Sequence, residues 1–390
     1  MRLAVLLLCC ACWGASQDAP QSPPAPYKDV PKHPTTFEGP GRDLPEPDDI
    51  KEVLLGYYGP AEDAHPEGGI LWQGATLALE EANREGGYKG KPFRFVTGWS
   101  ENPWRAGARF VTRMAFQDRV WAMVGSIEGA GTHLAEQVVA KALLTLVNPA
   151  ATDRSIHQAG VPWMYSIVQG DQQHAAVLAS ALAGRTLVIL KATDHDSRAF
   201  AAYLQTACSG VKARTRLEVE FEPGKPDLIE AARRAAAEAA QVDAIVVIAA
   251  PRDSARAVEA LRAAGYRGLL AGGPWCGRAA FVQEAGAAAE GVLFPLVAEP
   301  EPEFAQRFAA RFGREPDYAA ACAYDAVRML VEAVRKSGLN RSRIRDAVAA
   351  LTPYAGASGR IEWDEVGQNR RAPVLAKIEH GRPVRISPGR

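Results

Sequence analysis

The chain has 390 residues, of which 47% are hydrophobic, and its 45 Lys and Arg are balanced by 45 Asp and Glu. This length favours two or more compact units, and the hydrophobic fraction is that of an ordinary globular protein. The balanced charge argues against nucleic acid or an anionic membrane surface as the main partner.

The amino terminus has the pattern of a secretory signal peptide, which we place at residues 1–16. Arg2 precedes an apolar run at residues 3–8, and small residues at 14–16 offer a cleavage site. The run is too short for a mature membrane anchor. Lipidation of Cys12 and a buried N-terminal strand are the alternatives. We therefore expect a periplasmic or otherwise extracytoplasmic protein, with Cys12 as an alternative lipid anchor.

Residues 17–48 are rich in proline, from Pro20 to Pro47. A segment of this composition builds no core and prefers extended conformations. We interpret it as a flexible linker. An arm that packs on the folded body is the alternative.

From residue 50 onward, strand and helix patterns alternate. Strands are expected at 53–57, 93–96, 120–124 and 143–147, with helices at 70–83, 105–116 and 132–142 between them. A second series follows, with helices at 171–182, 197–206, from 227, and 254–264, and strands at 186–190, 215–221, 244–248 and 269–271. Such alternation predicts two doubly wound, Rossmann-like α/β lobes, each with a mainly parallel sheet.

The last part of the chain predicts several passages between the lobes. Helices dominate residues 303–351, and strands return at 359–363 and 374–378. Strands that return after long helices suggest that the chain revisits an earlier lobe, which would create a hinge. We assign lobe 1 to 49–168 and 295–355, and lobe 2 to 169–294 and 356–390.

Two loops of small residues, 126–132 and 148–152, each follow an expected buried strand. Small side chains let a ligand approach the backbone, and amides at a helix start favour anions. Neighbouring loops at the carboxyl ends of parallel strands would form a solute-binding cleft.

The body, from about Val53 to Ile386, resembles the type I periplasmic solute-binding proteins, in the branch of the leucine/isoleucine/valine receptors of ABC transporters. The resemblance is carried by motifs in a characteristic order: Gly59-Pro60, Gly74, Gly86-Gly87-Tyr88-Lys89-Gly90, Val124-Gly125-Ser126, Asn148-Pro149-Ala150-Ala151-Thr152, Ala288-Ala289-Glu290-Gly291-Val292, Pro316-Asp317-Tyr318, Ala323-Tyr324-Asp325-Ala326-Val327, Gly359-Arg360-Ile361, Trp363-Asp364 and Gly367-Gln368. It implies two lobes joined by three crossovers, near Gln169, Phe294 and Tyr354 to Gly356.

The resemblance also implies the ligand site. The loops at Gly129 and Ala130 and at Ala150, Ala151 and Thr152 correspond to those that hold the carboxylate and ammonium of an amino acid. In lobe 2, Trp275 follows Gly273-Pro274 where the family's amino-acid receptors tend to carry an acidic residue. A tryptophan offers a π face to a cation or stacks on an apolar group.

The segment 193–197 corresponds to a position where the family often has tyrosine, and we expect Asp194 and Ser197 at the ligand, with Asp194 or Asp196 restoring the negative charge. A solvated loop with a helix cap is the alternative reading of this segment. A surface loop is favoured over a reach across the cleft for His65 and Glu67.

We therefore expect a monomeric solute-binding protein that delivers a small polar organic solute (an amino acid, an amide or an aromatic acid) to an inner-membrane ABC permease. The alternative is a ligand-sensing subunit for a membrane signalling protein. The absence of GxSxG, and of metal-ligand spacing among the histidines and cysteines, argues against an enzyme, a metal site and a cofactor. A Cys208–Cys276 disulfide is left open, and Cys322 is interpreted as a small core residue.

Overall fold

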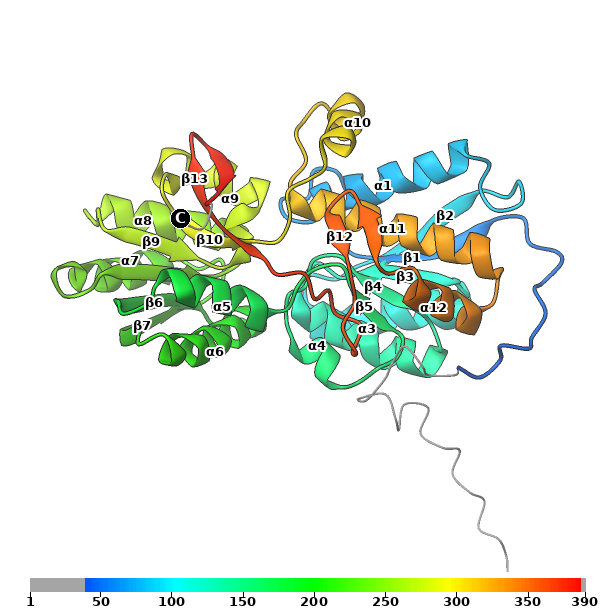
Figure 1. Ribbon diagram of the computed structural model, residues 1–390, viewed down its shortest axis with the longest axis horizontal. Helices are drawn as coiled ribbons and strands as arrows, with labels where there is room; N and C mark the ends of the chain where they lie inside the picture. Colours follow the sequence, from blue (N-terminus) through cyan, green and yellow to red (C-terminus); the bar gives the residue numbers. More distant parts are fainter. Residues whose placement is uncertain (1–38, 387–390) are drawn as a thin grey trace, which may run out of the picture.

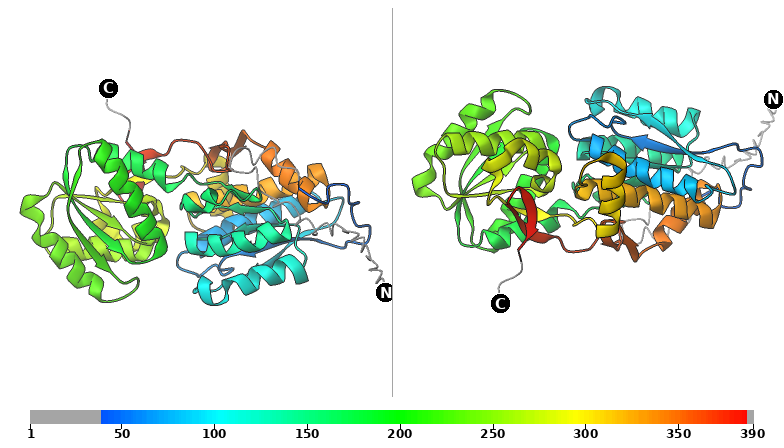
Figure 2. Two further views of the ribbon diagram at one scale, coloured as in Figure 1. Left: turned by 90° about the horizontal axis from the view of Figure 1, so that it is seen from below. Right: turned by 90° about the horizontal axis from the view of Figure 1, so that it is seen from above.

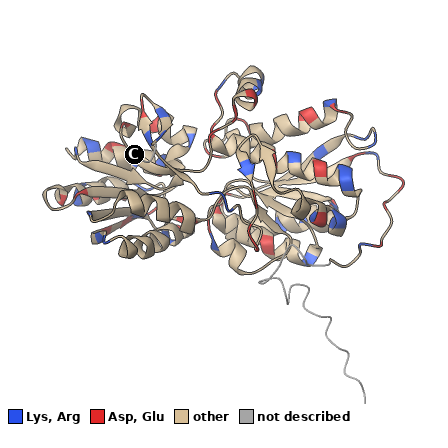
Figure 3. Ribbon diagram, in the orientation of Figure 1, with Lys and Arg blue, Asp and Glu red and all other residues tan. Residues whose placement is uncertain are grey.

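Two α/β lobes lie side by side in the computed structural model, which describes residues 39–386 (Figure 1). The expected signal peptide, Cys12 and residues 17–38 of the expected linker lie outside the described residues. Basic and acidic residues are interspersed along both lobes (Figure 3). Within the described part, no helix combines the length and apolar character needed to cross a membrane.

Lobe 1 is built on a five-stranded parallel sheet of order β2-β1-β3-β4-β5. The strands are β1 (Val53–Tyr58), β2 (Phe93–Gly98), β3 (Ala122–Gly125), β4 (Leu146–Asn148) and β5 (Met164–Ser166). The helices are α1 (Gly69–Arg84), α2 (Ala108–Thr112), α3 (Gly129–Ala142), α4 (Ser155–Gln158), α10 (Pro302–Phe312), α11 (Tyr318–Ser337) and α12 (Arg341–Ala350). The expected helix at 105–116 is instead α2 flanked by π-helical turns, Pro103–Gly107 and Arg113–Gln117.

Lobe 2 has a seven-stranded sheet of order β14-β13-β10-β9-β8-β6-β7. The parallel strands are β6 (Thr186–Ala192), β7 (Arg214–Phe221), β8 (Ala244–Ile248), β9 (Leu269–Gly272) and β10 (Leu293–Leu296). β13 (Val374–Glu379) and β14 (Arg382–Arg385) are antiparallel. The helices are α5 (Asp171–Ala181), α6 (His195–Gly210), α7 (Asp227–Ala237), α8 (Pro251–Ala263) and α9 (Ala279–Ala285).

The predicted fold class of two lobes with mainly parallel sheets is confirmed. Buried apolar runs such as Ala244–Ile248, whose residues are all fully buried, explain why these strands were readable from sequence. Strands β5 and β10 were not foreseen. α1 and α11 approach closely, and a Cβ at Gly74 would lie 2.1 Å from the carbonyl oxygen of Ala320.

Three segments connect the lobes (Figure 2). They run from β5 to α5, from β10 to α10, and from the region of Asn369 to β13. The third connection lies later than the predicted position at Tyr354 to Gly356. Strands β11 (Tyr354–Gly356) and β12 (Gly359–Ile361) form a separate two-stranded hairpin and join neither of the large sheets. The sequence of this hairpin therefore did not indicate which lobe it belongs to.

The segment after this hairpin packs on lobe 1. The ring of Trp363 lies 4.6 Å from that of Tyr165, and Asn369 Nδ2 donates to the carbonyl of Ile167 at 2.7 Å. Residues 356–369, which we assigned to lobe 2, therefore contact lobe 1. Conversely, β10 (Leu293–Leu296) lies between β9 and β13 in the sheet of lobe 2, so the predicted resumption of lobe 1 at 295 is slightly early.

Residues 39–48 lie against α12 instead of extending freely. Arg42 pairs with Asp346 at 2.6 Å, and Asn340 Nδ2 donates to the carbonyls of Gly41 and Leu44. For these ten residues of the predicted flexible linker, the structure matches the alternative of a packed arm, because their carbonyl groups find donors at the start of α12.

The described cysteines Cys208, Cys276 and Cys322 are all buried and unpaired, so the Cys208–Cys276 disulfide is not formed.

Candidate functional site

A cavity of about 200 Å³ lies between the lobes and is lined by both. Lobe 1 contributes Glu67, Ile127, Glu128 and Ala130, and lobe 2 contributes Asp194, His195, Asp196, Ser197, Pro223, Ala250, Pro251, Trp275 and Arg278. Larger hollows of about 670 and 520 Å³ lie beside the arm, but only lobe 1 and the arm line them. The shared lining makes the inter-lobe cavity the candidate site.

Helix starts at the carboxyl ends of parallel strands form much of this lining. α3 begins after Glu128, α6 after Asp194 and α8 after Ala250. These starts follow β3, β6 and β8, so the sheet edges of the two lobes face each other. This is the edge at which open α/β sheets bind ligands.

The cavity is rich in carboxylates. Burial, reinforced by Asp196, Glu67 and Asp194, raises the pKa of Glu128 to about 8. Burial also raises the pKa of Glu67, and it raises that of Asp196 to about 6. Each shift reports the cost of holding negative charge in a poorly solvated space. The cavity would therefore favour a cation.

The one guanidinium in the lining, Arg278, lowers the pKa of Glu67 against the effect of burial, but it is also paired with an acidic residue behind the cavity. Arg278 Nε donates to Asp317 Oδ2 at 3.0 Å, and a terminal nitrogen donates to the carbonyl of Glu67 at 2.6 Å. The side chains of Arg278 and Asp317 are only 6% and 5% exposed. The positive charge of Arg278 is thus largely matched by Asp317.

A lobe 2 carboxylate contacts the start of α3 across the cavity. Gly129 N–H donates to Asp196 Oδ2 at 2.8 Å. Asp196 Oδ1 is buried without a hydrogen-bond partner. The carboxylate of Asp196 thus occupies the amide of Gly129, which we expected to bind a solute carboxylate. A solute carboxylate could reach this amide only by displacing Asp196.

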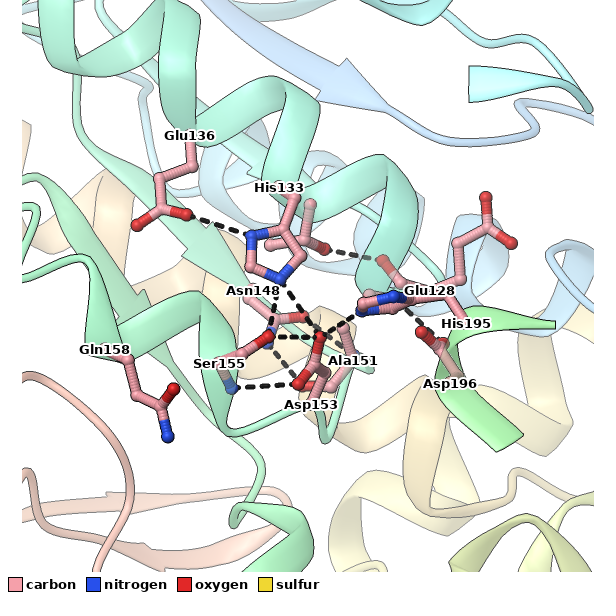
Figure 4. Close-up of polar contacts among 12 residues, drawn as sticks. Glu128, His133, Glu136, Asn148, Ala151, Asp153, Ser155, Gln158, His195 and Asp196 are labelled. Atoms are coloured by element: carbon pink, nitrogen blue, oxygen red, sulfur yellow. Dashed lines mark hydrogen bonds and ion pairs between the residues drawn. The ribbon is translucent and has the colours of Figure 1, made fainter. Parts of the chain in front are cut away.

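A second polar bridge joins the lobes beside the cavity (Figure 4). Asp153 Oδ2 contacts His195 Nε2 at 2.7 Å and His133 Nε2 at 3.1 Å. Hydrogen bonds to Asp153 and Glu136 raise the pKa of His133 to about 9. Against the penalty of burial, hydrogen bonds from His133 and His195 lower the pKa of Asp153. Asp153 and a protonated His133 therefore form an ion pair at neutral pH.

The structure brings together five of the eight residues that we expected at the ligand. Ala130, Asp194, Ser197 and Trp275 line the cavity, and Gly129 lies beside it through its contact with Asp196. The ring of Trp275 packs on Phe200 at 5.3 Å. Asp194 also caps α6, accepting from Ser197 N–H and Oγ–H, so the alternative of a helix cap holds together with cavity lining.

Ala150, Ala151 and Thr152 are absent from the lining. Asn148 Oδ1 accepts from the N–H groups of both Ala150 and Ala151, at 3.0 and 2.8 Å. The carbonyl of Thr152 accepts from Asp171 N–H, and Thr152 is buried. The side chain of Asn148 thus satisfies the amides that were expected to serve a ligand.

Several residues of the site were not foreseen. Glu128 stood unnoticed inside a small-residue loop, and Arg278, His133 and Asp153 gave no motif. Glu67 was favoured as a surface residue but lines the cavity. Glu67 lies in the loop between β1 and α1, at the same sheet edge as Glu128. This position was the sequence feature that could have predicted its place at the cavity.

Known proteins share this architecture. A family model described as periplasmic binding protein matches residues 59–382. An "Amino acid binding protein" of Pseudomonas aeruginosa is 24% identical over 159 residues, which span 40% of this chain and 42% of that relative. The chain thus matches less than half the length of this curated relative.

Among solved structures, the branched-chain amino acid transporter substrate-binding protein LivJ of Streptococcus pneumoniae, in complex with isoleucine, has a TM-score of 0.76 at 22% identity. The match covers 86% of this chain and all of that one. A solute-binding protein from R. palustris, in complex with benzoate, has a TM-score of 0.73 at 16% identity over 86% of this chain and 95% of that one. At these identities, both likenesses concern the fold alone.

Proposed function

The chain belongs to the periplasmic binding protein family, and from this premise we propose that it captures a small solute with a cationic group and delivers it to an inner-membrane ABC permease. The solute would bind in the inter-lobe cavity as the lobes close about their hinge. The protein would act outside the cytoplasm as a receptor, without making or breaking covalent bonds.

The carboxylate-rich lining is the observation that carries the choice of solute. Glu67, Glu128, Asp194 and Asp196 line the same small cavity, and Asp317 already matches the charge of Arg278. Burial and the neighbouring carboxylates raise the pKa of Glu128, and an ammonium group in the cavity would offset both by stabilising the ionised form. Amino acids, amino-acid amides and small amines carry such a group. An aromatic acid without an amine would add to the repulsion.

Two neighbours of the carboxylates would complete recognition. Trp275 presents an aromatic ring to the cavity, which suits either a cation or an apolar part of the solute. A solute that also carries a carboxylate would place it at the start of α3 by displacing Asp196 from Gly129. The freed Asp196 would then be available to the ammonium.

Closure supplies the mechanism. Lobe 1 and lobe 2 both line the cavity, so a solute gains its full contacts only when the lobes meet. Binding would shift the population toward the closed form through the difference in affinity between the two forms. The permease would recognise this closed form.

A thermal-shift screen of the mature chain tests the proposal. The panel contains amino acids, amino-acid amides, polyamines and aromatic acids. A true solute at about 100 times its Kd should stabilise the protein by about 2.7 kcal/mol. We expect only compounds with an amine to raise the melting temperature. The rise should be smaller for Glu128→Gln than for the control Glu259→Gln, which changes an exposed residue of α8. A shift from benzoate and from no amine would overturn the choice of solute.

The transport role has its own test. The loaded protein should stimulate ATP hydrolysis by a partner permease in membrane vesicles. Stimulation of a membrane kinase or chemoreceptor instead would favour the sensing alternative.

A further inference from the structure

Three metal-ligating side chains converge where the two lobes meet (Figure 4). His133 lies on α3, Asp153 lies between β4 and α4, and His195 begins α6 of lobe 2. One ligand atom from each lies within 4.8 Å of the other two. Small rotations of the side chains would place all three around one ion.

Contacts on the outer side of this cluster orient its ligands. His133 Nδ1 lies 3.5 Å from Glu136 Oε2, which leaves Nε2 facing Asp153. Ser155 N–H donates to Asp153 Oδ1 at 2.8 Å. Asp153 Oδ2 faces the two imidazoles and also accepts from Ser155 Oγ at 2.9 Å, a hydrogen bond that a metal ion would replace. A carboxylate behind a histidine and a hydrogen bond behind a carboxylate are the usual supports of metal ligands.

We propose that His133, Asp153 and His195 bind a divalent transition-metal ion, with Zn²⁺ the best match, as a bridge between the lobes. Two imidazole nitrogens and one carboxylate oxygen suit Zn²⁺, whereas Mg²⁺ and Ca²⁺ prefer oxygen ligands throughout. The ion would displace the proton that His133 holds on Nε2 toward Asp153, so zinc binding would release a proton to solvent. The side chain of His195 is 41% exposed, so an ion can enter from solvent and keep a water as its fourth ligand.

The ion would stabilise the closed form. His195 belongs to lobe 2, and the other two ligands belong to lobe 1, so the full ligand set exists only when the lobes meet. An ion that binds one form better than another shifts the population toward that form. His195 also lines the solute cavity, so the ion and the solute would favour the same closed form.

Zinc binding is measured on the full mature chain, without a polyhistidine tag, after removal of metal by a chelator. A competition titration with a chromogenic chelator should give one Zn²⁺ per chain. Co²⁺ should bind in its place and give the visible absorption of a low-coordinate site with imidazole ligands. Mg²⁺ and Ca²⁺ should not compete. A wild-type chain that takes up no Zn²⁺ would overturn the proposal.

Variants locate the ion. His195→Ala changes a partly exposed residue and should weaken Zn²⁺ binding by at least 100-fold with an unchanged circular dichroism spectrum. Glu136→Gln should weaken it by about 10- to 100-fold, as expected for the loss of an outer partner. His380→Asn, at a turn far along the chain, should bind as the wild type does. Equal affinity in His195→Ala and the wild type would place the ion elsewhere and overturn the proposal.

Small-angle X-ray scattering tests the bridge itself. Zn²⁺ should lower the radius of gyration of the wild-type chain and leave that of His195→Ala unchanged. A lowered radius in both proteins would contradict bridging at this site. No solute is added in these experiments, so their outcome is independent of the proposed solute.

Discussion

The two lobes present different chemistry to the cavity that they share. Lobe 1 brings the start of α3, with Glu128 beside it, whereas lobe 2 brings the side chains of Asp194, Asp196 and Trp275. The amides of Ala150 and Ala151 in lobe 1 are taken by Asn148, and that of Gly129 is taken by Asp196 of lobe 2. The comparison teaches that main-chain donors at these loops are already hydrogen-bonded, whereas carboxylates from both lobes line the cavity.

The lobes also differ in what holds them at their contact. Lobe 1 supplies Asp153, whose side chain is fully buried, while lobe 2 supplies His195, which is partly exposed. A buried acceptor in lobe 1, Asp153, and an exposed partner in lobe 2, His195, suit a contact that forms when the lobes close and breaks when they open. Substitutions made in one lobe at a time measure what each lobe contributes to this contact and to the cavity.

The largest effect is expected from Asp153→Ala, which removes the lobe 1 acceptor shared by both histidines. The variant should lose about 3 kcal/mol of unfolding free energy near pH 6, because a buried charge pair is broken. The pKa of His133 is raised to about 9, so the pair's contribution is complete below pH 6.5 and fades as the pH rises through 9. It also fades on acidification below the ordinary pKa of Asp153, since the folded-state pKa of that carboxyl is lowered.

Urea unfolding followed from pH 4 to 10 measures this difference. Asp49→Ala, which changes an exposed residue beside the same lobe, should stay within about 0.5 kcal/mol of the wild type. A loss in Asp153→Ala that is the same at pH 6 and pH 10 would contradict the ion pair with His133.

Glu128→Gln should have the next largest effect and the opposite sign. The raised pKa of Glu128, about 8, means that the folded state holds this proton more tightly than the unfolded state. Stability from this group is present below its ordinary pKa and is lost as the pH rises toward 8. Removing the charge should therefore stabilise the solute-free protein by about 2 kcal/mol at pH 8.5, allowing for solvent screening.

The groups that face Glu128 are the carboxylates of Glu67, Asp194 and Asp196 and the phenol of Tyr58. Thermal midpoints from pH 5 to 8.5 should show the gain in Glu128→Gln growing with pH. In Glu259→Gln, the midpoints should follow those of the wild type. A gain that shrinks as the pH rises would contradict a raised pKa for Glu128 in the folded protein.

Trp275→Ala probes the lobe 2 side of the cavity. Loss of the ring should weaken solute binding by about 1–2 kcal/mol, or roughly 5- to 30-fold, while Trp275→Phe keeps most of the affinity. Calorimetric titration with the solute found in the screen measures both variants. Because Trp275 also packs on Phe200, unfolding curves serve to separate binding from stability. Wild-type affinity in Trp275→Ala would remove this ring from recognition.

The smallest effect concerns the arm at residues 39–48, which lies on lobe 1. Arg42→Ala removes the ion pair with Asp346, whose side chains are 28% and 33% exposed. The expected cost is about 0.5 kcal/mol, because solvent screens such pairs. A protease should cleave the arm faster in Arg42→Ala than in Lys225→Ala, a control that changes an exposed basic residue of lobe 2. Equal cleavage rates in the two variants would mean that this pair does not hold the arm.

Much of the fold was readable because strands and helices have local signatures. The run 244–248 predicted β8, and the apolar spacing of 70–83 predicted α1 to within a residue at each end. The strand expected at 359–363 is present as β12, but the sequence did not show its lobe, because the segment is attached to lobe 1 by the contact of Trp363 with Tyr165. Contacts between segments that are far apart in the chain produce no hydrophobic periodicity that could be recognised in the sequence.

The candidate site was readable only in part, for the same reason. Small residues after β3 and the Gly-Pro before Trp275 marked the correct sheet edges. The sequence did not show that the amides of Ala150 and Ala151 are occupied, because an amide group is free or occupied according to its neighbours, and Asn148 lies close enough to accept from both. The pairing of Asp153 with His133 and His195 joins positions 20 and 42 residues away.

The sequence by itself determined the alternation of buried strands and amphipathic helices, and hence two lobes with parallel sheets, because side-chain periodicity is a property of local order. The tertiary structure alone decided which charges meet between the lobes. Whether a carboxylate binds a solute, caps a helix or pairs with a histidine depends on distance and solvent exposure, and both are fixed only when remote parts of the chain come together.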